Sequence, residues 1–219
     1  MARYELMRDA LGREKQRAER LHDFFAEHRI LVLNIMGSPG SGKTTLIEKV
    51  IEKLKDDVTI SVIEGDLATT VDSERIEKTG ADVFQINTGG ICHLSPEMVE
   101  RAIDKMNIRD KSILMIENVG NLVCPASFDL GEDIRMVLVS TPEGDDKPEK
   151  YPVMFLGADI FVITKMDLIE MTDFNIERAI KSVQKIKHNT EIFTFSRDSN
   201  EDAKRISTWL KEEYTKKIK

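Results

Sequence analysis

The chain alternates short apolar runs with longer stretches in which apolar residues recur every three or four positions. Most of the apolar runs are near-continuous in Ile, Val, Leu, Phe and Met, which is typical of strands covered on both faces. Strands are expected at 30–36, 58–64, 83–87, 112–117, 134–140, 159–164 and 191–195. Helical patterns lie between most of them, so the sequence predicts an α/β fold, a doubly wound and mostly parallel seven-stranded sheet flanked by helices.

Residues 4–28 carry apolar side chains at alternating steps of three and four, which predicts an N-terminal helix. This helix either packs on the flank of the domain or serves as a docking helix. We expect a helical extension at 1–29 and a single α/β domain at 30–219. The segment 141–152 contains three prolines and mixed charges and is expected to be a surface loop without regular structure. Further helices are expected from Thr44, from Pro96 with Ser95 as its N-cap, and over 174–187 and 200–214.

Composition and charge exclude several classes of protein. The 219 residues have a net charge of −7 and are 41% hydrophobic, which suits a globular domain. The acidic balance argues against a nucleic-acid partner, and no apolar run approaches the ~20 residues that span a membrane. Two cysteines provide no disulfide framework, and the charged N-terminus lacks the apolar core of a secretory signal. We therefore expect a cytoplasmic protein.

The strongest motif follows the first predicted strand. Residues 37–44 read G-S-P-G-S-G-K-T, the G-x-x-x-x-G-K-T pattern of a phosphate-binding P-loop between a strand and a helix. Backbone N–H groups in such a loop, and the start of the helix, bind phosphate oxygens. Lys43 is expected to reach the β- and γ-phosphates, and the Thr44 hydroxyl to hold Mg²⁺. The expected nucleotide-binding residues here are Gly37, Ser38, Pro39, Gly40, Ser41, Gly42, Lys43, Thr44 and Thr45.

Two other predicted strands carry carboxylates near the same edge of the sheet. Glu117 ends a strand as a Walker B acid does, although Asp is commoner there, and is expected to act on the Mg²⁺ shell. Gly120 stands where a backbone N–H would sense a γ-phosphate. Asp66 is a candidate for a second Mg²⁺ ligand. Asp72 either positions the attacking water or caps a helix, and a nucleotide-responsive segment is expected over 67–75.

A third motif indicates the base. Thr164, Lys165 and Asp167 fit the N-K-x-D guanine motif, with Thr in place of Asn. The carboxylate of Asp167 can accept from N1–H and the exocyclic amine of guanine, and adenine offers neither donor; each such bond is worth roughly 1.5–3 kcal/mol. The stem of Lys165 can lie across the base. Without Asn at position 164, the P-loop is expected to lose one brace. Ser196 and Arg197 follow the last strand, where a backbone N–H would add a base contact.

Both cysteines and one of the histidines lie just after predicted strand ends. Cys92 and His93 follow two glycines, and Cys124 lies a few residues beyond Glu117. Thiolate and imidazole are ligands of Zn²⁺ and, among borderline metals, of Ni²⁺. Three ligands leave a tetrahedral site incomplete, so a water or a second protomer would complete it. The alternative is two buried structural cysteines and an unrelated histidine.

Together these motifs give the chain a family resemblance. It resembles the hydrogenase maturation GTPases that incorporate nickel, which belong to the SIMIBI class of P-loop proteins. The matching stretches are 37–44, 64–66, 89–93, 116–125, 143–148 with 150–152, and 164–167. The stretches 116–125 and 143–152 are specific to this family rather than to GTPases at large.

The resemblance implies slow GTP hydrolysis and homodimerisation that depends on GTP and metal. It also implies a Ni²⁺ or Zn²⁺ site at the dimer interface, formed by Cys92, His93 and Cys124 of both subunits. Nickel would pass to the large subunit of a [NiFe]-hydrogenase. A small zinc- and nickel-binding accessory protein would dock on the N-terminal helix. The expected ligands and cofactors are thus GTP, Mg²⁺, and Ni²⁺ or Zn²⁺, with no nucleic acid and no membrane.

Two other functions fit parts of the sequence. A urease-type nickel-insertion GTPase shares the P-loop and a Cys–His motif, but that motif is typically Cys-Pro-His, and the family lacks the second cysteine that stands here at Cys124. A regulatory GTPase with structural cysteines would show no metal-dependent dimer. A P-loop kinase would need an acceptor-binding lid, which nothing in 141–152 resembles.

Overall fold

A parallel sheet organises the part of the chain that the structure describes. The computed structural model describes the backbone of residues 2–66 and 71–219, and the side chains of 12–66 and 72–219. Within these residues, seven strands pair in the order β3-β2-β4-β1-β5-β6-β7, and every neighbouring pair is parallel. The strands are β1 Leu31–Gly37, β2 Ile60–Asp66, β3 Asp82–Asn87, β4 Ile113–Glu117, β5 Ile134–Ser140, β6 Ile160–Thr164 and β7 Glu191–Phe195.

All seven predicted strands are confirmed, with ends that differ by two residues at most. The central strands are buried along their whole length, which explains their near-continuous apolar sequences. Asp66 and Glu117 are the last residues of β2 and β4. The carboxyl ends of parallel strands share one edge, so the candidate residues that follow them are gathered there.

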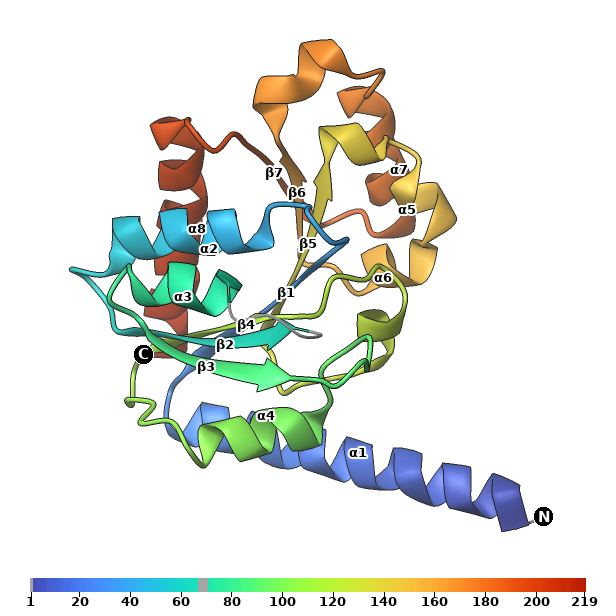
Figure 1. The fold of residues 1–219 in the computed structure, drawn as a ribbon, viewed down its shortest axis with the longest axis vertical. Helices are drawn as coiled ribbons and strands as arrows, with labels where there is room; N and C mark the ends of the chain where they lie inside the picture. The colour runs from blue at the N-terminus through green and yellow to red at the C-terminus, as the bar shows by residue number, and fades with distance from the viewer. Residues whose placement is uncertain (1, 67–70) are drawn as a thin grey trace.

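Helices cover both faces of the sheet (Figure 1). One face packs against α2 Lys43–Leu54, α3 Val71–Glu77 and α8 Asn200–Lys217. The other face is divided between two clusters: α1 Ala2–Glu27 and α4 Pro96–Ile103 cover one half, and α6 Pro152–Leu156 and α7 Ile176–Ile186 cover the other. This confirms the doubly wound α/β class. The remaining elements are α5 Lys147–Lys150 and the 3₁₀ helices η1 Cys124–Ser127, η2 Thr141–Glu143 and η3 Met166–Met171.

The segment 141–152 is ordered, so the prediction of a loop without regular structure is wrong. It contains η2 and α5. Ser140 N–H donates to the Glu143 carboxylate at 2.8 Å, and the buried Asp145 accepts from Arg178 at 3.1 Å. Each proline stands in the first turn of a short helix, where its missing N–H costs nothing. The prolines therefore begin helices here instead of excluding them.

The predicted N-terminal helix is present as α1. Leu21 and Phe25 are buried in the cluster that α1 shares with α4, and Ala18 of α1 is also buried. Arg20 pairs with Glu100 of α4 at 2.9 Å. The N-terminal part of α1 extends beyond the rest of the fold (Figure 1). Of the described helices, none combines the length and the apolar character that a membrane crossing requires.

Candidate functional site

The P-loop curls between β1 and α2. Gly40 and Gly42 have φ angles of 74° and 94°, in the left-handed region that glycine enters without strain. Gly37 allows close packing, because a Cβ there would lie 2.8 Å from the Leu138 carbonyl. The loop delivers the chain into α2 at Lys43, so the helix N-terminus points its free N–H groups at the loop's concave side.

A cavity of about 390 Å³ lies at the carboxyl edge of the sheet and collects most of the predicted phosphate-side residues. Six predicted residues of the P-loop and helix start contribute to its wall, together with all the candidate acids. Its lining comprises Pro39, Gly40, Gly42, Lys43, Thr44, Thr45, Glu64, Gly65, Asp66, Asp72, Arg75, Glu117, Asn118, Val119, Gly120 and Lys165. The predicted residues Gly37, Ser38 and Ser41 are not part of this lining. A nucleotide's phosphates would therefore meet both the loop and the carboxylates.

Lys43 and Thr44 are nearly buried and already oriented by the loop and β4. Lys43 Nζ lies 3.4 Å from the Gly37 carbonyl and 3.3 Å from the Ser38 carbonyl. Thr44 Oγ1 donates to Glu117 Oε1 at 2.9 Å. The hydroxyl and the carboxylate thus share one spot, as residues that act on a common Mg²⁺ shell must.

Glu64 adds a second buried carboxylate beside Glu117, because the two are register partners on β2 and β4. Burial raises the pKa of Glu64 to about 8, and the nearby carboxylates, Glu117 first, add to the rise. Burial likewise raises the pKa of Glu117 to about 7, against the lowering effect of Lys43. Among the described residues, the Oε2 atoms of both glutamates are buried without a hydrogen-bond partner.

These features fit a divalent cation. Mg²⁺ prefers hydroxyl and carboxylate oxygens, and Thr44, Glu117 and Asp66 provide them at one wall of the cavity. The cation's charge would favour the ionised carboxylates that burial and crowding disfavour. Glu64 was not among the residues predicted from sequence. What identifies Glu64 is its pairing with Glu117 on the neighbouring strand, and this pairing is known only once the strand order is known.

Asp72 and Arg75 form an ion pair at the cavity's outer side. Asp72 lies in the first turn of α3, and its carboxylate accepts from Arg75 at 3.0 Å. Arg75 also pairs with Glu48 of α2 at 2.6 Å. Both Asp72 and Arg75 line the cavity, so the two interpretations of Asp72, water positioning or a helix end, both remain. The expected nucleotide-responsive segment begins at 67–70, which lie outside the described residues.

A second cavity, of about 280 Å³, adjoins the first and collects the predicted base-side residues. Lys165 lines both cavities. Asp167 and Arg197 also line the second, with Phe195 at its wall. Ser196 is not among the residues that line this cavity, and its N–H donates to the Asp202 carboxylate at 3.0 Å.

Thr164 braces the P-loop, so the prediction that it would remove a brace is wrong. Its Oγ1 donates to the Ser41 carbonyl at 2.5 Å, and the side chain is buried. A threonine hydroxyl can make this bond because the loop lies close to the end of β6.

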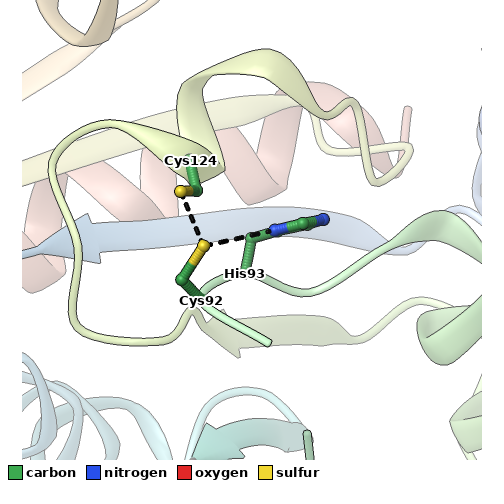
Figure 2. Close-up of side chains that lie close together, drawn as sticks. All are labelled: Cys92, His93 and Cys124. Atoms are coloured by element: carbon green, nitrogen blue, oxygen red, sulfur yellow. Dashed lines mark hydrogen bonds between the residues drawn. The ribbon is translucent and has the colours of Figure 1, made fainter. Parts of the chain in front are cut away.

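The two cysteines and His93 form a cluster beside the first cavity. Cys92 Sγ lies 2.6 Å from Cys124 Sγ and 3.9 Å from His93 Nδ1, and both cysteines are free. All three ligand atoms lie within 4.8 Å of one another. Figure 2 shows Cys92 and His93 on one loop and Cys124 on another, with the two sulfurs facing each other. Thiolates and an imidazole are ligand types that suit Ni²⁺ or Zn²⁺.

His93 is held by an aromatic stack. Its ring lies 3.8 Å from the Phe128 ring, with an interplanar angle of 14°. Burial lowers the pKa of His93, which favours the neutral imidazole that binds metals. The hydrogen bond with Cys92 raises the pKa of the Cys124 thiol.

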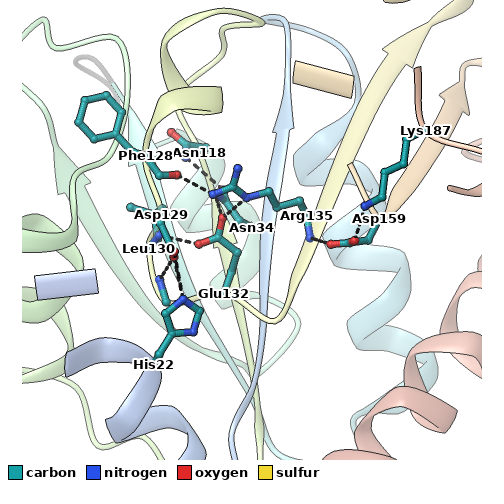
Figure 3. Close-up of polar contacts among 11 residues, drawn as sticks. His22, Asn34, Asn118, Phe128, Asp129, Leu130, Glu132, Arg135, Asp159 and Lys187 are labelled. Atoms are coloured by element: carbon teal, nitrogen blue, oxygen red, sulfur yellow. Dashed lines mark hydrogen bonds and ion pairs between the residues drawn. The ribbon is translucent and has the colours of Figure 1, made fainter. Parts of the chain in front are cut away.

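A polar network connects the residue after Glu117 with the residue that stacks on His93 (Figure 3). Asn118, directly after Glu117, donates to Asn34 at 3.1 Å, and Asn34 donates to Glu132 at 3.2 Å. Arg135 donates to Glu132 at 2.6 Å and to the Phe128 carbonyl at 3.1 Å. Hydrogen bonds therefore run from the residue after the candidate Mg²⁺ ligand to the residue that stacks on His93. Sequence alone could not reveal this network, because its members come from two strands, β1 and β5, and from loop segments that are distant from β1 in the sequence.

Comparison with known proteins agrees with this geometry. Residues 31–194 match the family described as "CobW/HypB/UreG, nucleotide-binding domain". The chain is 44% identical to "Hydrogenase maturation factor HypB" of Escherichia coli (strain K12), covering 92% of this chain and 70% of that protein. It is 38% identical to "Hydrogenase/urease maturation factor HypB" of Helicobacter hepaticus, covering 95% and 87%. A crystal structure of HypB from Helicobacter pylori in complex with nickel is similar with a TM-score of 0.89 and 38% identity, covering 93% and 96%.

Proposed function

Because this chain belongs to the HypB family of hydrogenase maturation factors, with a P-loop nucleotide-binding domain, we propose that it is a GTP-hydrolysing nickel metallochaperone. It delivers nickel to the precursor of a [NiFe]-hydrogenase during assembly of the active site. The client is the hydrogenase large subunit.

One observation carries this proposal: the metal-ligand cluster adjoins the nucleotide cavity. Cys92 and His93 follow β3, and Cys124 follows β4, whose last residue lines the cavity. Residue 121, three positions before Cys124, is hydrogen-bonded to the first residue of the P-loop. A change at the phosphates can therefore alter the metal ligands through few intermediate contacts.

The GTPase part rests on the two cavities. Lys43 and the P-loop N–H groups bind phosphate oxygens, and Asp167 selects guanine. Mg²⁺ would be held by Thr44, Asp66 and Glu117, and would neutralise charge that develops on the phosphates. Gly120 lines the cavity and packs so closely on Pro39 that a Cβ would lie 2.9 Å from the Pro39 backbone. We assign its backbone N–H to the γ-phosphate. Catalysis by positioning alone suits a slow switch.

The metal site favours a homodimer that forms with GTP and metal. One subunit offers three ligands, and a closed tetrahedral site needs four. The residues flanking the cysteines are apolar and exposed: Ile91 is 44% exposed and Val123 is 58% exposed. Their burial against a second copy would bring the ligands of both subunits together.

The remaining partners follow from the arrangement of the chain. We assign residues 1–29 to a helical extension and 30–219 to the GTPase domain. The N-terminal part of α1 projects beyond the fold and offers a docking surface for the small zinc- and nickel-binding accessory protein (Figure 1). A urease precursor is a second candidate client, because a 38% identical relative is described as a hydrogenase/urease maturation factor.

Equilibrium nickel binding tests the proposal. Wild type, Cys92→Ala and the control Ser127→Ala, on η1 but outside the cluster, are titrated with Ni²⁺ in GDP and in a non-hydrolysable GTP analogue. We expect nucleotide-dependent nickel binding in wild type and Ser127→Ala, and its loss in Cys92→Ala with GTP hydrolysis retained. Nickel binding that ignores both Cys92 and the nucleotide would leave a regulatory GTPase with structural cysteines as the better conclusion.

A further inference from the structure

Asn121 contacts both the P-loop and the metal cluster. Its backbone N–H donates to the Gly37 carbonyl at 3.0 Å, and the two residues form an isolated antiparallel bridge. Its side chain makes two contacts with Cys124: one with the Cys124 backbone N–H at 3.2 Å and one with the Cys124 Sγ at 3.7 Å. One residue thus links the loop that binds phosphates with a candidate nickel ligand.

The orientation of the Asn121 amide follows from its partners. Oδ1 accepts from the backbone N–H groups of Val123 at 2.6 Å and Cys124 at 3.2 Å. Backbone N–H groups can only donate, so the atom that they contact is the oxygen. The amide nitrogen must then face the sulfur of Cys124. The oxygen holds the turn that leads into η1, and the nitrogen donates to the sulfur.

Such contacts change how a sulfur binds a metal. An N–H donor lowers the energy of the sulfur lone pairs and fixes their direction, and loss of a group that orients a ligand typically lowers metal affinity by roughly 10- to 100-fold. The amide is neutral, so it exerts this effect without altering the charge of the site.

We infer that Asn121 is a positioning residue that sets Cys124 for nickel and transmits the state of the P-loop to it. Asn121 is tied to the loop by its backbone and to Cys124 by its side chain, with two residues between them. A shift of Gly37 when nucleotide binds is therefore passed on to the sulfur. This inference rests on the proposed function, and it assigns the coupling between nucleotide and nickel to one side chain.

Two variants separate the contacts of Asn121, and a third serves as the control. Asn121→Ala removes both the turn acceptor and the sulfur donor. Asn121→Ser keeps an oxygen that can accept from the turn but is too short to reach the sulfur. Both retain the backbone N–H that bonds to Gly37. The control is Asn87→Ala: Asn87 accepts from the Gly89 N–H at 2.9 Å in the loop that leads to Cys92, and none of its described contacts reaches a cysteine sulfur.

The measurement is the nickel dissociation constant, obtained by competition with a chromophoric chelator in Mg²⁺–GDP and in a Mg²⁺–GTP analogue. The thiolate-to-nickel charge-transfer absorption is recorded in the same samples. For Asn121→Ala we expect about 10- to 100-fold weaker binding, a ratio of the two dissociation constants close to one, and a charge-transfer band at lower energy. Asn121→Ser should show the same band shift with a smaller loss of affinity. Asn87→Ala should match wild type.

The inference would be overturned if Asn121→Ala had the same nickel affinity, the same ratio of dissociation constants in the two nucleotides and the same charge-transfer band as wild type. The proposed function would still stand in that case, provided that Cys92→Ala abolishes nickel binding. A wild type that binds no nickel through Cys92 would overturn both. Far-ultraviolet circular dichroism and affinity for the GTP analogue check the folding of each variant. If Asn121→Ala does not fold, the band position and affinity of Asn121→Ser decide the question.

Discussion

Replacing Thr164 with valine tests whether its hydroxyl braces the P-loop. Thr164 is 1% exposed, and its Oγ1 donates to the Ser41 carbonyl at 2.5 Å. Valine keeps the shape of the side chain but removes the donor, so the carbonyl loses this partner inside the protein. Such a loss costs about 1–3 kcal/mol. For a chain of this size it corresponds to a fall in Tm of roughly 2–12 °C.

Nucleotide affinity should fall together with stability, because Ser41 belongs to the loop whose N–H groups bind phosphate. The assay is thermal unfolding with and without GDP, combined with titration of a fluorescent GDP analogue. Thr172→Val is the matched control: its hydroxyl donates to the Ile169 carbonyl at 3.0 Å, and Thr172 lines neither nucleotide cavity. This control should lower Tm and leave GDP affinity unchanged. Unchanged Tm and GDP affinity in Thr164→Val would refute the bracing role.

Three further changes address the rest of the nucleotide site. Asp167→Asn should weaken GDP binding by roughly tenfold or more, since hydrogen bonds to a charged group are worth about 1.5–3 kcal/mol. Competition binding with GDP and ADP checks this. A GDP affinity equal to that of wild type would exclude Asp167 from base recognition. Gly120→Ala should lower affinity for a GTP analogue more than for GDP, because its Cβ would lie 2.9 Å from the Pro39 backbone and displace the residue assigned to the γ-phosphate; equal losses for both nucleotides in isothermal titration would contradict that role. In the nucleotide-free protein, the pKa of Glu64 is raised from 4.5 to about 8, so the folded state holds a proton that the unfolded state releases. The free energy of unfolding should therefore decrease as pH rises from about 5 through 8, and Glu64→Gln should flatten this slope in urea unfolding; parallel slopes would contradict it.

The strands and the P-loop could be predicted from sequence because their signals are local. A strand buried on both faces leaves a continuous apolar run, and residues 37–44 form one uninterrupted motif. The segment 141–152 was misinterpreted because a proline in the first turn of a helix has the same local signature as a proline in a loop. Only the later residues of each short helix, and the burial of Asp145, separate the two cases.

The rest of the candidate site depends on contacts between distant segments. Glu64 becomes part of it through its register with Glu117, which requires the strand order. Arg75 reaches the cavity because Glu48 of α2 holds it. The hydroxyl of Thr164 serves as a brace because the loop lies close to β6, a distance that no motif records. Sequence patterns therefore indicate which residue types meet at the sheet edge, and the packing decides which bonds they make.

The mass of the wild-type chain in solution with Ni²⁺, measured by light scattering in GDP and in a GTP analogue, tests the central claim most directly. A nucleotide-gated nickel site shared by two subunits predicts the mass of one chain, 24.9 kDa, with GDP and twice that mass with the GTP analogue. Addition of a nickel chelator should return the mass to that of one chain. The same mass with both nucleotides, before and after the chelator, would contradict the claim that nucleotide and nickel act together at this site.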